Sequence, residues 1–320
     1  MIHPDVFRAR LADEGTERLD VALVARGLVR SRARGAQAVK DGRVRVDGVL
    51  AVRPAQAVGP GSDVTVDDAP DARLVSRAGG KLVGALDALE RLATSGAATP
   101  DPRGLDCLDL GASTGGFTHV LLERGARAVA AVDVGHDQLV PELRRDPRVV
   151  VREGLNARDL RPDNLPFAPA LVVADLSFIS LTLVLPAVRA AAPDAELLLM
   201  VKPQFEVGRA RLGRGGVVRD PEHHVAAVLD VVACAAEHGA RLRGVVASAV
   251  PGPAGNREFF CWFSPETRPG PSGPDAARGD AARGDTARAD AERAVRAAVA
   301  DSSGATVRTV GATPHDREAR

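Results

Sequence analysis

Near the middle of this chain, an apolar run leads directly into a glycine-rich turn and then into a helix. The segment reads Leu108-Asp109-Leu110-Gly111-Ala112-Ser113-Thr114-Gly115-Gly116-Phe117-Thr118. Glycines at such a turn allow a ligand to approach the backbone closely. A phosphate-binding loop needs Lys followed by Ser or Thr after its last glycine, and a dinucleotide fold needs G-x-G-x-x-G. The turn has neither pattern, so it predicts a different kind of cofactor site at the end of a strand.

Short apolar runs alternate with helical stretches around this turn. Seven runs predict strands: Leu105–Leu110, Ala128–Asp133, Arg148–Val151, Ala170–Asp175, Leu197–Val201, Gly244–Val250 and Glu258–Phe263. Helices are expected from Lys81 onward and over Phe117–Arg124, Phe178–Ala191 and Pro221–His238. Near-continuous apolar strands are typical of a parallel sheet that helices cover on both faces. Residues 77–265 are therefore expected to form a doubly wound α/β domain with a seven-stranded, Rossmann-like sheet.

Polar side chains stand at the ends of several of these strands, and ligands of a doubly wound sheet bind at its carboxyl edge. Asp133 ends the second strand, where a carboxylate can accept hydrogen bonds from both ribose hydroxyls of a nucleoside. Asn156 follows the third strand and is a candidate adenine contact. Asp175 and Lys202 end the fourth and fifth strands. These residues predict a cleft beside the glycine-rich turn.

Two further charged residues are expected at the same edge. Glu258 begins the last strand, and an antiparallel strand would bring its first residue there. Lys81 lies at the start of the first helix and could cap the cleft. The chain has only three lysines among 42 basic residues, and two of them, Lys81 and Lys202, fall at this edge. Arginine cannot replace a lysine where the side chain must share or release a proton.

The form D-L-G-x-x-x-G-G-F resembles motif I of S-adenosylmethionine-dependent methyltransferases. Lys81, Asp175, Lys202 and Glu258 match the K-D-K-E tetrad of the FtsJ-like ribose 2′-O-methyltransferases. The resemblance implies that Lys202 activates or holds the 2′-oxygen, Lys81 fixes the ribose, and the two carboxylates orient the lysines. It also implies S-adenosylmethionine as the cofactor. The residues expected to bind it are Asp109, Gly111, Ser113, Gly115, Gly116, Phe117, Asp133, Asn156 and Asp175.

Residues 1–66 predict a separate small α+β module, joined through a linker at 67–76. Ser31 is a suitable N-cap for a helix over Arg32–Lys40, and Asp47-Gly48 marks a tight turn between strands. The pattern resembles the RNA-binding domain named after ribosomal protein four of the small subunit, called the S-four domain below. From position 26 to 53 there are eight basic and two acidic residues, which suits phosphate contacts. A solvated arginine-rich helix is the alternative.

The candidate RNA contacts lie in this module and in the arginine-rich loop after Lys202. They are Arg18, Ser31, Arg32, Arg34, Lys40, Arg43, Arg45, Arg209, Arg211 and Arg214. Aromatic side chains are scarce, so stacking on an RNA base would fall to Phe117, Phe178 or Phe205, or to arginine planes.

An S-four domain joined to an FtsJ-like domain resembles the TlyA (hemolysin A) family of ribosomal RNA methyltransferases over about residues 11–263. That resemblance implies 2′-O-methylation of cytidine in 16S and 23S ribosomal RNA, with ribosomal RNA or ribosomal subunits as partners. One departure is Ala78-Gly79-Gly80 before Lys81, where members often have a larger residue. The alternatives are a catalytically silent RNA-binding or ribosome-assembly protein and a hemolysin-type membrane-active protein.

Composition limits the remaining possibilities. No run of eighteen apolar residues occurs, and charges stand where a signal peptide needs an apolar stretch. Cys107, Cys234 and Cys261 lie far apart in apolar runs, which favours buried thiols in a reducing cytoplasm over disulfides or a metal site. The chain is therefore expected to be cytoplasmic and monomeric, with no metal. Residues 266–320 repeat Ala-Ala-Arg-Gly-Asp and predict a low-complexity, mostly disordered tail with a possible helix over Thr286–Ala300.

Overall fold

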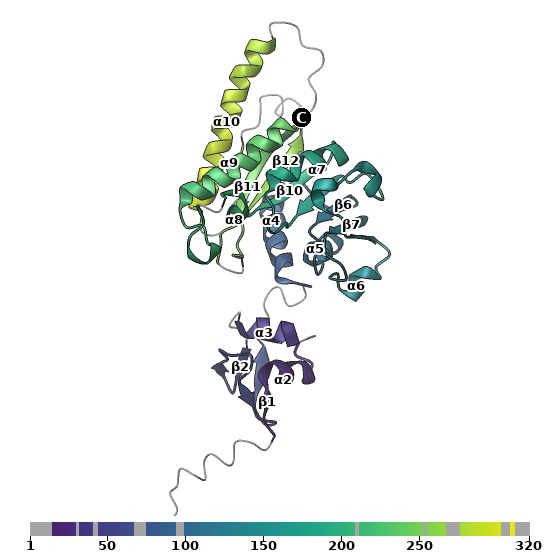
Figure 1. Cartoon of the computed structure of the whole chain (residues 1–320), viewed down its shortest axis with the longest axis vertical. Coiled ribbons are helices and arrows are strands. Elements are labelled where there is room, and N and C mark those ends of the chain that lie inside the picture. Colours follow the sequence, from purple (N-terminus) through teal and green to yellow (C-terminus); the bar gives the residue numbers. More distant parts are fainter. Residues whose placement is uncertain are drawn as a thin grey trace, which may run out of the picture. The chain divides into compact units, whose positions relative to one another are not determined.

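Two units make up the chain, Met1–Arg73 and Leu74–Arg320. The computed structural model (Figure 1) describes residues 15–29, 32–40, 44–66, 75–93, 99–208, 211–252, 255–266, 276–301 and 308–310.

The first unit packs two helices against short antiparallel strands. Its described elements are β1 (Glu17–Arg18), α2 (Leu19–Ala25), α3 (Arg32–Lys40), β2 (Val44–Val46), β3 (Val49–Leu50), β4 (Ala57–Val58) and β5 (Val64–Val66). Strand β2 lies between β3 and β5, and β1 pairs with β4. The predicted turn between β2 and β3 is confirmed, since Asp47 and Gly48 both have positive φ, as a tight hairpin turn requires. Leu19 and Leu23 of α2 are fully buried in the core of the unit.

The described residues of the second unit form an eight-stranded sheet with the order β13-β11-β12-β10-β9-β6-β7-β8. The strands are β6 (Asp106–Leu110), β7 (Ala128–Asp133), β8 (Val149–Glu153), β9 (Leu171–Ala174), β10 (Glu196–Val201), β11 (Ala240–Ala247), β12 (Phe259–Pro265) and β13 (Arg308–Thr309). Strands β6 to β10 are parallel, whereas β12 runs antiparallel to β10 and β11. The expected doubly wound sheet and its antiparallel strand β12 are confirmed; β6 to β12 correspond to the seven predicted strands, and β13 is an eighth that was not predicted.

Helices cover both faces of this sheet. One face carries α4 (Arg77–Ala93), α5 (Gly116–Glu123) and α6 (Pro141–Arg144), and the other carries α7 (Leu185–Ala191), α9 (Pro221–Glu237) and α10 (Ala276–Ala300). Successive side chains of β12 are buried on opposite faces of the sheet. Phe260 and Trp262 pack against the helices of the first face, and Phe259 and Phe263 pack against those of the second. Such alternation with burial on both sides explains why the strand is apolar throughout.

The expectation of a mostly disordered tail is wrong for residues 276–301 and 308–310. The possible helix over Thr286–Ala300 is the second half of α10, which packs against α9 and β11, and β13 extends the sheet beside β11. Figure 1 shows α9 and α10 next to each other. The buried side chains of α10 recur at the i, i+3, i+4, i+7 and i+8 spacing of one helix face. They are small, which is why a search for large apolar residues overlooks them: Ala291, Ala294, Val295, Ala298 and Val299.

The expected helix over Phe178–Ala191 begins later in the structure. Residues Leu181–Leu183 form a short 3-10 helix (η3), and α7 starts at Leu185. Phe178 has φ of +66°, a left-handed conformation that no α-helix contains. The residues between the end of β9 and η3 therefore form an irregular loop at the carboxyl edge of the sheet.

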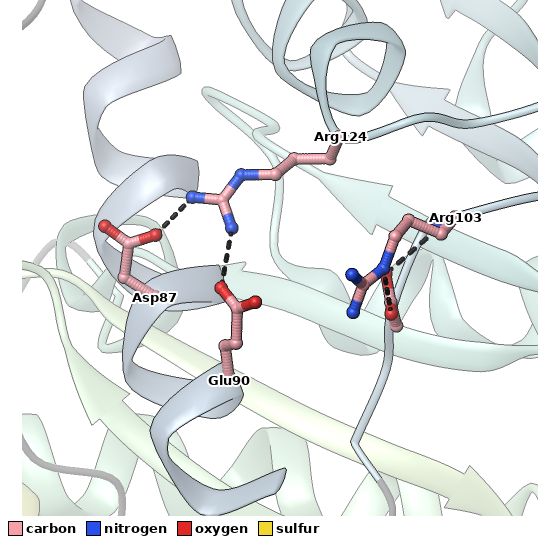
Figure 2. A network of polar contacts seen from close by, with 5 residues as sticks. Asp87, Glu90, Arg103 and Arg124 are labelled. Atoms are coloured by element: carbon pink, nitrogen blue, oxygen red, sulfur yellow. Dashed lines mark hydrogen bonds and ion pairs between the residues drawn. The ribbon is translucent and has the colours of Figure 1, made fainter. Parts of the chain in front are cut away.

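A polar network ties α4 to α5. Arg124 caps the end of α5 and reaches Asp87 and Glu90 of α4, with 3.3 Å between its Nη1 and Glu90 Oε2 (Figure 2). Nearby, Arg103 Nε donates to Asp101 Oδ2 at 2.6 Å. Since α5 follows the glycine-rich turn directly, the network fixes the helix that carries Lys81 relative to that turn.

The packing of α10 can be tested at Val295, which is fully buried. Replacing Val295 with Ala should lower the free energy of unfolding by about 1–3 kcal/mol, because buried methyl groups are lost. Replacing the exposed Arg288 with Ala should change it by less than about 0.5 kcal/mol. Urea titration of the full chain measures both. Equal stability of the two variants would show that α10 does not dock on the sheet.

Candidate active site

A pocket of about 530 Å³ opens at the carboxyl edge of the sheet in the second unit. Its walls come from the turn after β6, the loop after β9, the residue after β10 and the residues before β12. From β6 the chain winds toward β7 and β8 on one side and toward β9 and β10 on the other. The pocket therefore lies at the topological switch point, where ligands of doubly wound sheets bind.

The four residues predicted as a catalytic tetrad all line this pocket and form two ion pairs. Lys81 Nζ lies 2.6 Å from Glu258 Oε2, and Lys202 Nζ lies 2.5 Å from Asp175 Oδ1. Lys202 also donates to Ser177 Oγ at 2.9 Å. The two lysines are only 6% and 7% exposed, and Glu258 is 1% exposed. Buried charges need such partners, so each ammonium is balanced by one carboxylate.

The register of the sheet explains why these residues meet. Val201 at the end of β10 pairs with Phe259 at the start of β12. Lys202 therefore leaves the sheet where Glu258 enters it, as an antiparallel strand predicts. Asp175 follows β9, the parallel neighbour of β10, so it reaches the same edge.

The glycines of the turn are required by contacts within the protein. Gly111 has φ of +83°, and a Cβ there would lie 2.8 Å from the carbonyl oxygen of Asp175. A Cβ on Gly116 would overlap Ser76 Oγ and approach the amide nitrogen of Gly79 to 2.9 Å. The turn is thus wedged between the loop that carries Asp175 and the start of α4. Close approach of a ligand is not the only reason for these glycines.

Asp133 supports the same turn. Its Oδ2 accepts a hydrogen bond from the Ser113 amide at 2.8 Å, and its Oδ1 accepts one from the Gly135 amide at 2.7 Å. Each carboxylate oxygen can accept a further bond, so the side chain keeps capacity for a ligand hydroxyl. Asn156 accepts from the amide of Arg158 at 3.1 Å and caps a 3-10 helix, η1 (Ala157–Asp159).

Asp109 lies beneath the turn and is fully buried. Thr118 Oγ1 donates to its Oδ2 at 2.7 Å, while its Oδ1 has no hydrogen-bond partner among the described residues. Burial raises the pKa of this carboxyl to about 7, and the charges of Asp175 and Asp133 act in the same direction. Asp109 is not among the described residues that line the pocket. The geometry makes it a support for the turn, whereas a direct cofactor contact stays a prediction.

The three aromatic candidates for base stacking differ in exposure. Phe117 is 2% exposed and stacks on Phe260 with 6.0 Å between ring centres, so it belongs to the core. Phe178 is 91% exposed, and its ring centre lies 5.2 Å from that of Phe205. Lys202 Nζ lies 6.0 Å from the centre of the Phe205 ring. All three rings line the pocket, and Phe178 and Phe205 are the more exposed pair that a ligand there can stack on.

In the first unit, two candidate RNA contacts share one carboxylate. Arg18 Nε lies 2.9 Å from Asp20 Oδ1, and Arg32 Nη2 lies 3.2 Å from Asp20 Oδ2. These arginines hold the pKa of Asp20 down at about 2. Both arginine side chains remain more than half exposed, so they can still meet a phosphate. Arg45 and, in the second unit, Arg211 are exposed as well.

Some predicted contacts fall outside the described residues. Ser31, Arg43 and Arg209 are not described, nor are the side chains of Arg34, Lys40 and Arg214.

Several residues that line the pocket were missed from the sequence, and two of them, Ser177 and Asn256, lie close to the tetrad. Ser177 binds Lys202, and Asn256 is 4% exposed and lines the pocket beside Glu258. Each lies two positions from a tetrad member, in Asp175-Leu176-Ser177 and Asn256-Arg257-Glu258. Their closeness in sequence to the tetrad was the one feature from which they could have been predicted as pocket residues.

Comparisons with known proteins divide along the same two units. Residues 74–264 match the FtsJ-like methyltransferase family, and residues 17–64 match the S4 domain, which is the S-four domain expected above. The protein named 16S/23S rRNA (cytidine-2′-O)-methyltransferase TlyA from Mycobacterium tuberculosis is 51% identical over 251 residues, covering 78% of this chain and 90% of the relative.

Two further relatives carry hemolysin names. Hemolysin A of Brachyspira hyodysenteriae is 34% identical over 248 residues, covering 77% of this chain and 99% of the relative. A solved structure of a hemolysin-named protein from Streptococcus thermophilus superposes with a TM-score of 0.60 at 33% identity, covering 87% of this chain and 99% of that one. Within the described part of the chain, no helix has the length and apolar character needed to cross a membrane.

The burial of Asp109 predicts a pH-dependent stability. Its pKa is about 7 in the folded protein and near 3.8 in the unfolded chain, so the folded state favours the protonated form. The resulting stability is complete below pH 4 and is lost as the pH rises through about 7. Asp109→Asn keeps the acceptor for Thr118 but cannot ionise. Between pH 6 and pH 8, the free energy of unfolding of the Asp109→Asn variant should therefore fall by about 1 kcal/mol less than that of the unaltered protein.

Urea titrations at the two pH values measure this effect. Asp163→Asn, at an exposed position, is the matched control and should keep the pH dependence of the unaltered protein. An identical decline in Asp109→Asn and the unaltered protein would contradict the burial of a protonated carboxyl.

Proposed function

Because the chain belongs to the FtsJ-like methyltransferase family, together with the TlyA (hemolysin A) proteins, we propose that it methylates a ribose 2′-hydroxyl of ribosomal RNA with S-adenosylmethionine. The observation that carries the proposal is the pair of buried ion pairs, Lys81–Glu258 and Lys202–Asp175, in one pocket. The Mycobacterium tuberculosis relative is named for cytidine in 16S and 23S rRNA, and we extend that target to this chain.

The residues around the glycine-rich turn fit the cofactor. The pocket has the volume of a typical small-molecule site, and Gly111, Ser113 and Gly116 of the turn line it. Ser113 and Asp133, which are already hydrogen-bonded to each other, would hold the ribose of the bound nucleoside. When bound, S-adenosylmethionine supplies an electrophilic methyl group on its sulfonium.

Lys202 is the residue that we assign to the 2′-oxygen. The attacking hydroxyl is weakly acidic, so it must be aimed and lose its proton as the new bond forms. An ammonium has three N–H donors; Lys202 donates one of them to Ser177 Oγ and forms an ion pair with Asp175. A further N–H of the ammonium would hold the oxygen and stabilise the negative charge that develops on it, and the proton of the hydroxyl would pass to water as the methyl group leaves the sulfonium. Lys81 of α4, oriented by Glu258, fixes the ribose.

Phe178 is the side chain that we assign to the target base. A bulky residue at positive φ costs on the order of 1–3 kcal/mol, and the 91% exposed ring gains little burial in return. A base stacked on the ring would use this conformation, because single-stranded bases bind readily to exposed aromatic faces. The S-four domain, with Arg18, Arg32 and Arg45 exposed, would add phosphate contacts that hold the RNA.

The direct test is transfer of labelled methyl from S-adenosylmethionine to ribosomal RNA and to ribosomal subunits. The modified nucleotide is then mapped by its resistance to alkaline cleavage, which requires a free 2′-hydroxyl. Binding of RNA without transfer would favour the silent ribosome-assembly protein instead. Methylation on a base would contradict the assignment of the ribose.

Lys202→Arg tests the chemistry. The variant keeps the positive charge but places a planar guanidinium where a compact ammonium reaches Asp175 and Ser177. We expect methylation to be abolished while binding of RNA and S-adenosylmethionine is nearly unchanged. Arg211→Lys in the exposed loop should cost little at low salt. If Lys202→Arg keeps activity within about tenfold, roughly 1.4 kcal/mol of barrier, then Lys202 is only an electrostatic anchor.

Phe178→Ala tests the stacking assignment. Loss of the ring should lower kcat/KM for RNA by the equivalent of about 1–3 kcal/mol, which is the usual contribution of one base stacked on an aromatic ring. The thermal midpoint should not fall, because the side chain is exposed. Leu183→Ala removes another exposed apolar side chain and should leave methylation unchanged. Equal activity of Phe178→Ala and Leu183→Ala would contradict a stacked base.

A further inference from the structure

One wall of the pocket is formed by a loop that carries no member of the tetrad. Residues 211–220, called the arginine–glycine loop below, connect the segment after Lys202 to α9. Gly215 and Gly216 of this loop line the pocket, and both have positive φ, +75° and +72°. Arg211 and Arg219 lie on either side of the two glycines and are exposed.

The side chain of Asn256 holds this loop by both of its polar atoms. Its Oδ1 accepts a hydrogen bond from the Val218 amide at 2.9 Å, and its Nδ2 donates to the Gly216 carbonyl at 3.0 Å. Only a side-chain amide offers a donor and an acceptor side by side in this way. Since the residue is 4% exposed, water cannot readily replace either bond. The two contacts fix the loop at the point where it meets the pocket.

A second buried side chain holds the same loop from α9. His224 is 3% exposed, its Nε2 lies 3.0 Å from the Val218 carbonyl, and its ring packs on Phe259. Burial lowers the pKa of His224, which favours the neutral ring. Because a carbonyl can only accept, Nε2 carries the proton and donates. Both backbone groups of Val218 are therefore bound by side chains of the surrounding framework.

The segment that holds the loop also holds Glu258. The Ser248 amide donates to the Glu258 carbonyl at 2.8 Å, and the Gly252 amide donates to the Asn256 carbonyl at 2.8 Å. A Cβ on Gly252 would lie 2.7 Å from Glu258 Oε1, so this turn also packs against the catalytic carboxylate. The position of the arginine–glycine loop is thus coupled to that of the Lys81–Glu258 pair through Asn256.

We propose that Asn256 is a positioning residue that sets the arginine–glycine loop at the rim of the pocket, where Arg211 and Arg219 meet the phosphates flanking the target ribose. This inference rests on the proposed function, because it takes RNA to be the substrate. Both polar atoms of the Asn256 side chain are engaged by the loop, so it contributes through the loop and not through contact with the reacting atoms. Phosphate contacts fix the register of a nucleic acid without reading its bases, which is the role this loop has.

The test compares steady-state methylation of RNA by Asn256→Ala, Asn256→Asp and the unaltered full chain. Both variants should raise KM for RNA about tenfold, while kcat stays within about threefold. The slope of log KM against log salt concentration should become shallower by about one, which corresponds to the loss of one phosphate contact. Asn256→Asp keeps the acceptor for Val218 but sets an oxygen against the Gly216 carbonyl, so it decides the matter if Asn256→Ala does not fold. Asn164→Ala is the matched control, because Asn164 also accepts from a backbone amide but does not line the pocket.

A double-mutant comparison separates the loop from general damage. Arg211→Ala with Arg219→Ala should raise KM in the same way, and adding Asn256→Ala should then change it little, because all three act through one loop. A fall in kcat with KM and salt dependence unchanged, or full additivity, would overturn the proposal.

RNA affinity measured by filter binding, as a function of salt, needs no methyl transfer. An inactive unaltered protein whose affinity still depends on Asn256 would therefore refute the proposed function and keep the loop assignment. Unchanged affinity and salt dependence in an active protein would refute the loop assignment alone.

Discussion

The arrangement of the second unit depends on one constraint: two lysine ammonium groups are buried in the same pocket, and each needs a carboxylate partner. Removing a charge from water costs several kcal/mol, and the cost is recovered only when a partner of opposite charge lies at hydrogen-bond distance. Lys81 on α4 finds its partner 177 positions away in Glu258, and Lys202 finds its partner in Asp175. The ends of β9, β10 and β12 and the start of α4 must therefore converge on one point. The strand order and the antiparallel β12 provide that convergence.

The glycine-rich turn makes this convergence sterically possible. Gly111 lets the end of β6 pass the carbonyl of Asp175, and Gly116 lets α5 pass the first turn of α4. Ala78 and Gly79 are the residues of α4 that a Cβ on Gly116 would meet, so their small size suits the close packing that the turn needs. Arg124 then fixes the far end of α5 to Asp87 and Glu90 (Figure 2). The cofactor turn and the Lys81 helix thereby form one rigid wall.

Much of this arrangement could be predicted from the sequence because it follows from topology. Parallel strands end at one edge, so Asp175 and Lys202 had to lie together once the strands were recognised. Which lysine pairs with which carboxylate could not be predicted, since the pairing depends on side-chain directions that the sequence does not show. The left-handed backbone of Phe178 could not be predicted either, because it goes against the preference of a bulky residue and the sequence pattern favours a helix there.

Features built from small or polar residues were also hidden. The packed face of α10 consists largely of alanines, which look alike in the sequence whether they are buried or exposed. The contacts of Asn256 could not be predicted because its hydrogen-bond partners, Gly216 and Val218, lie some forty positions earlier in the chain. Both follow from long-range packing, which local patterns do not report.

The two kinds of basic residue divide the work in a way that their chemistry explains. Arginine presents a planar fork of several donors, so one side chain can gather backbone carbonyls at loop and helix ends. Arg189 donates to the carbonyls of Pro193, His238 and Gly239, and Arg257 donates to those of Val299 and Asp301 at the end of α10. The two lysines whose side chains are described instead each meet one carboxylate within the pocket. A compact ammonium leaves room for a ligand atom beside it, which a guanidinium would fill. In a chain with 42 basic residues, of which three are lysines, the two described lysine side chains both lie in the pocket, whereas Arg189 and Arg257 hold loop and helix ends.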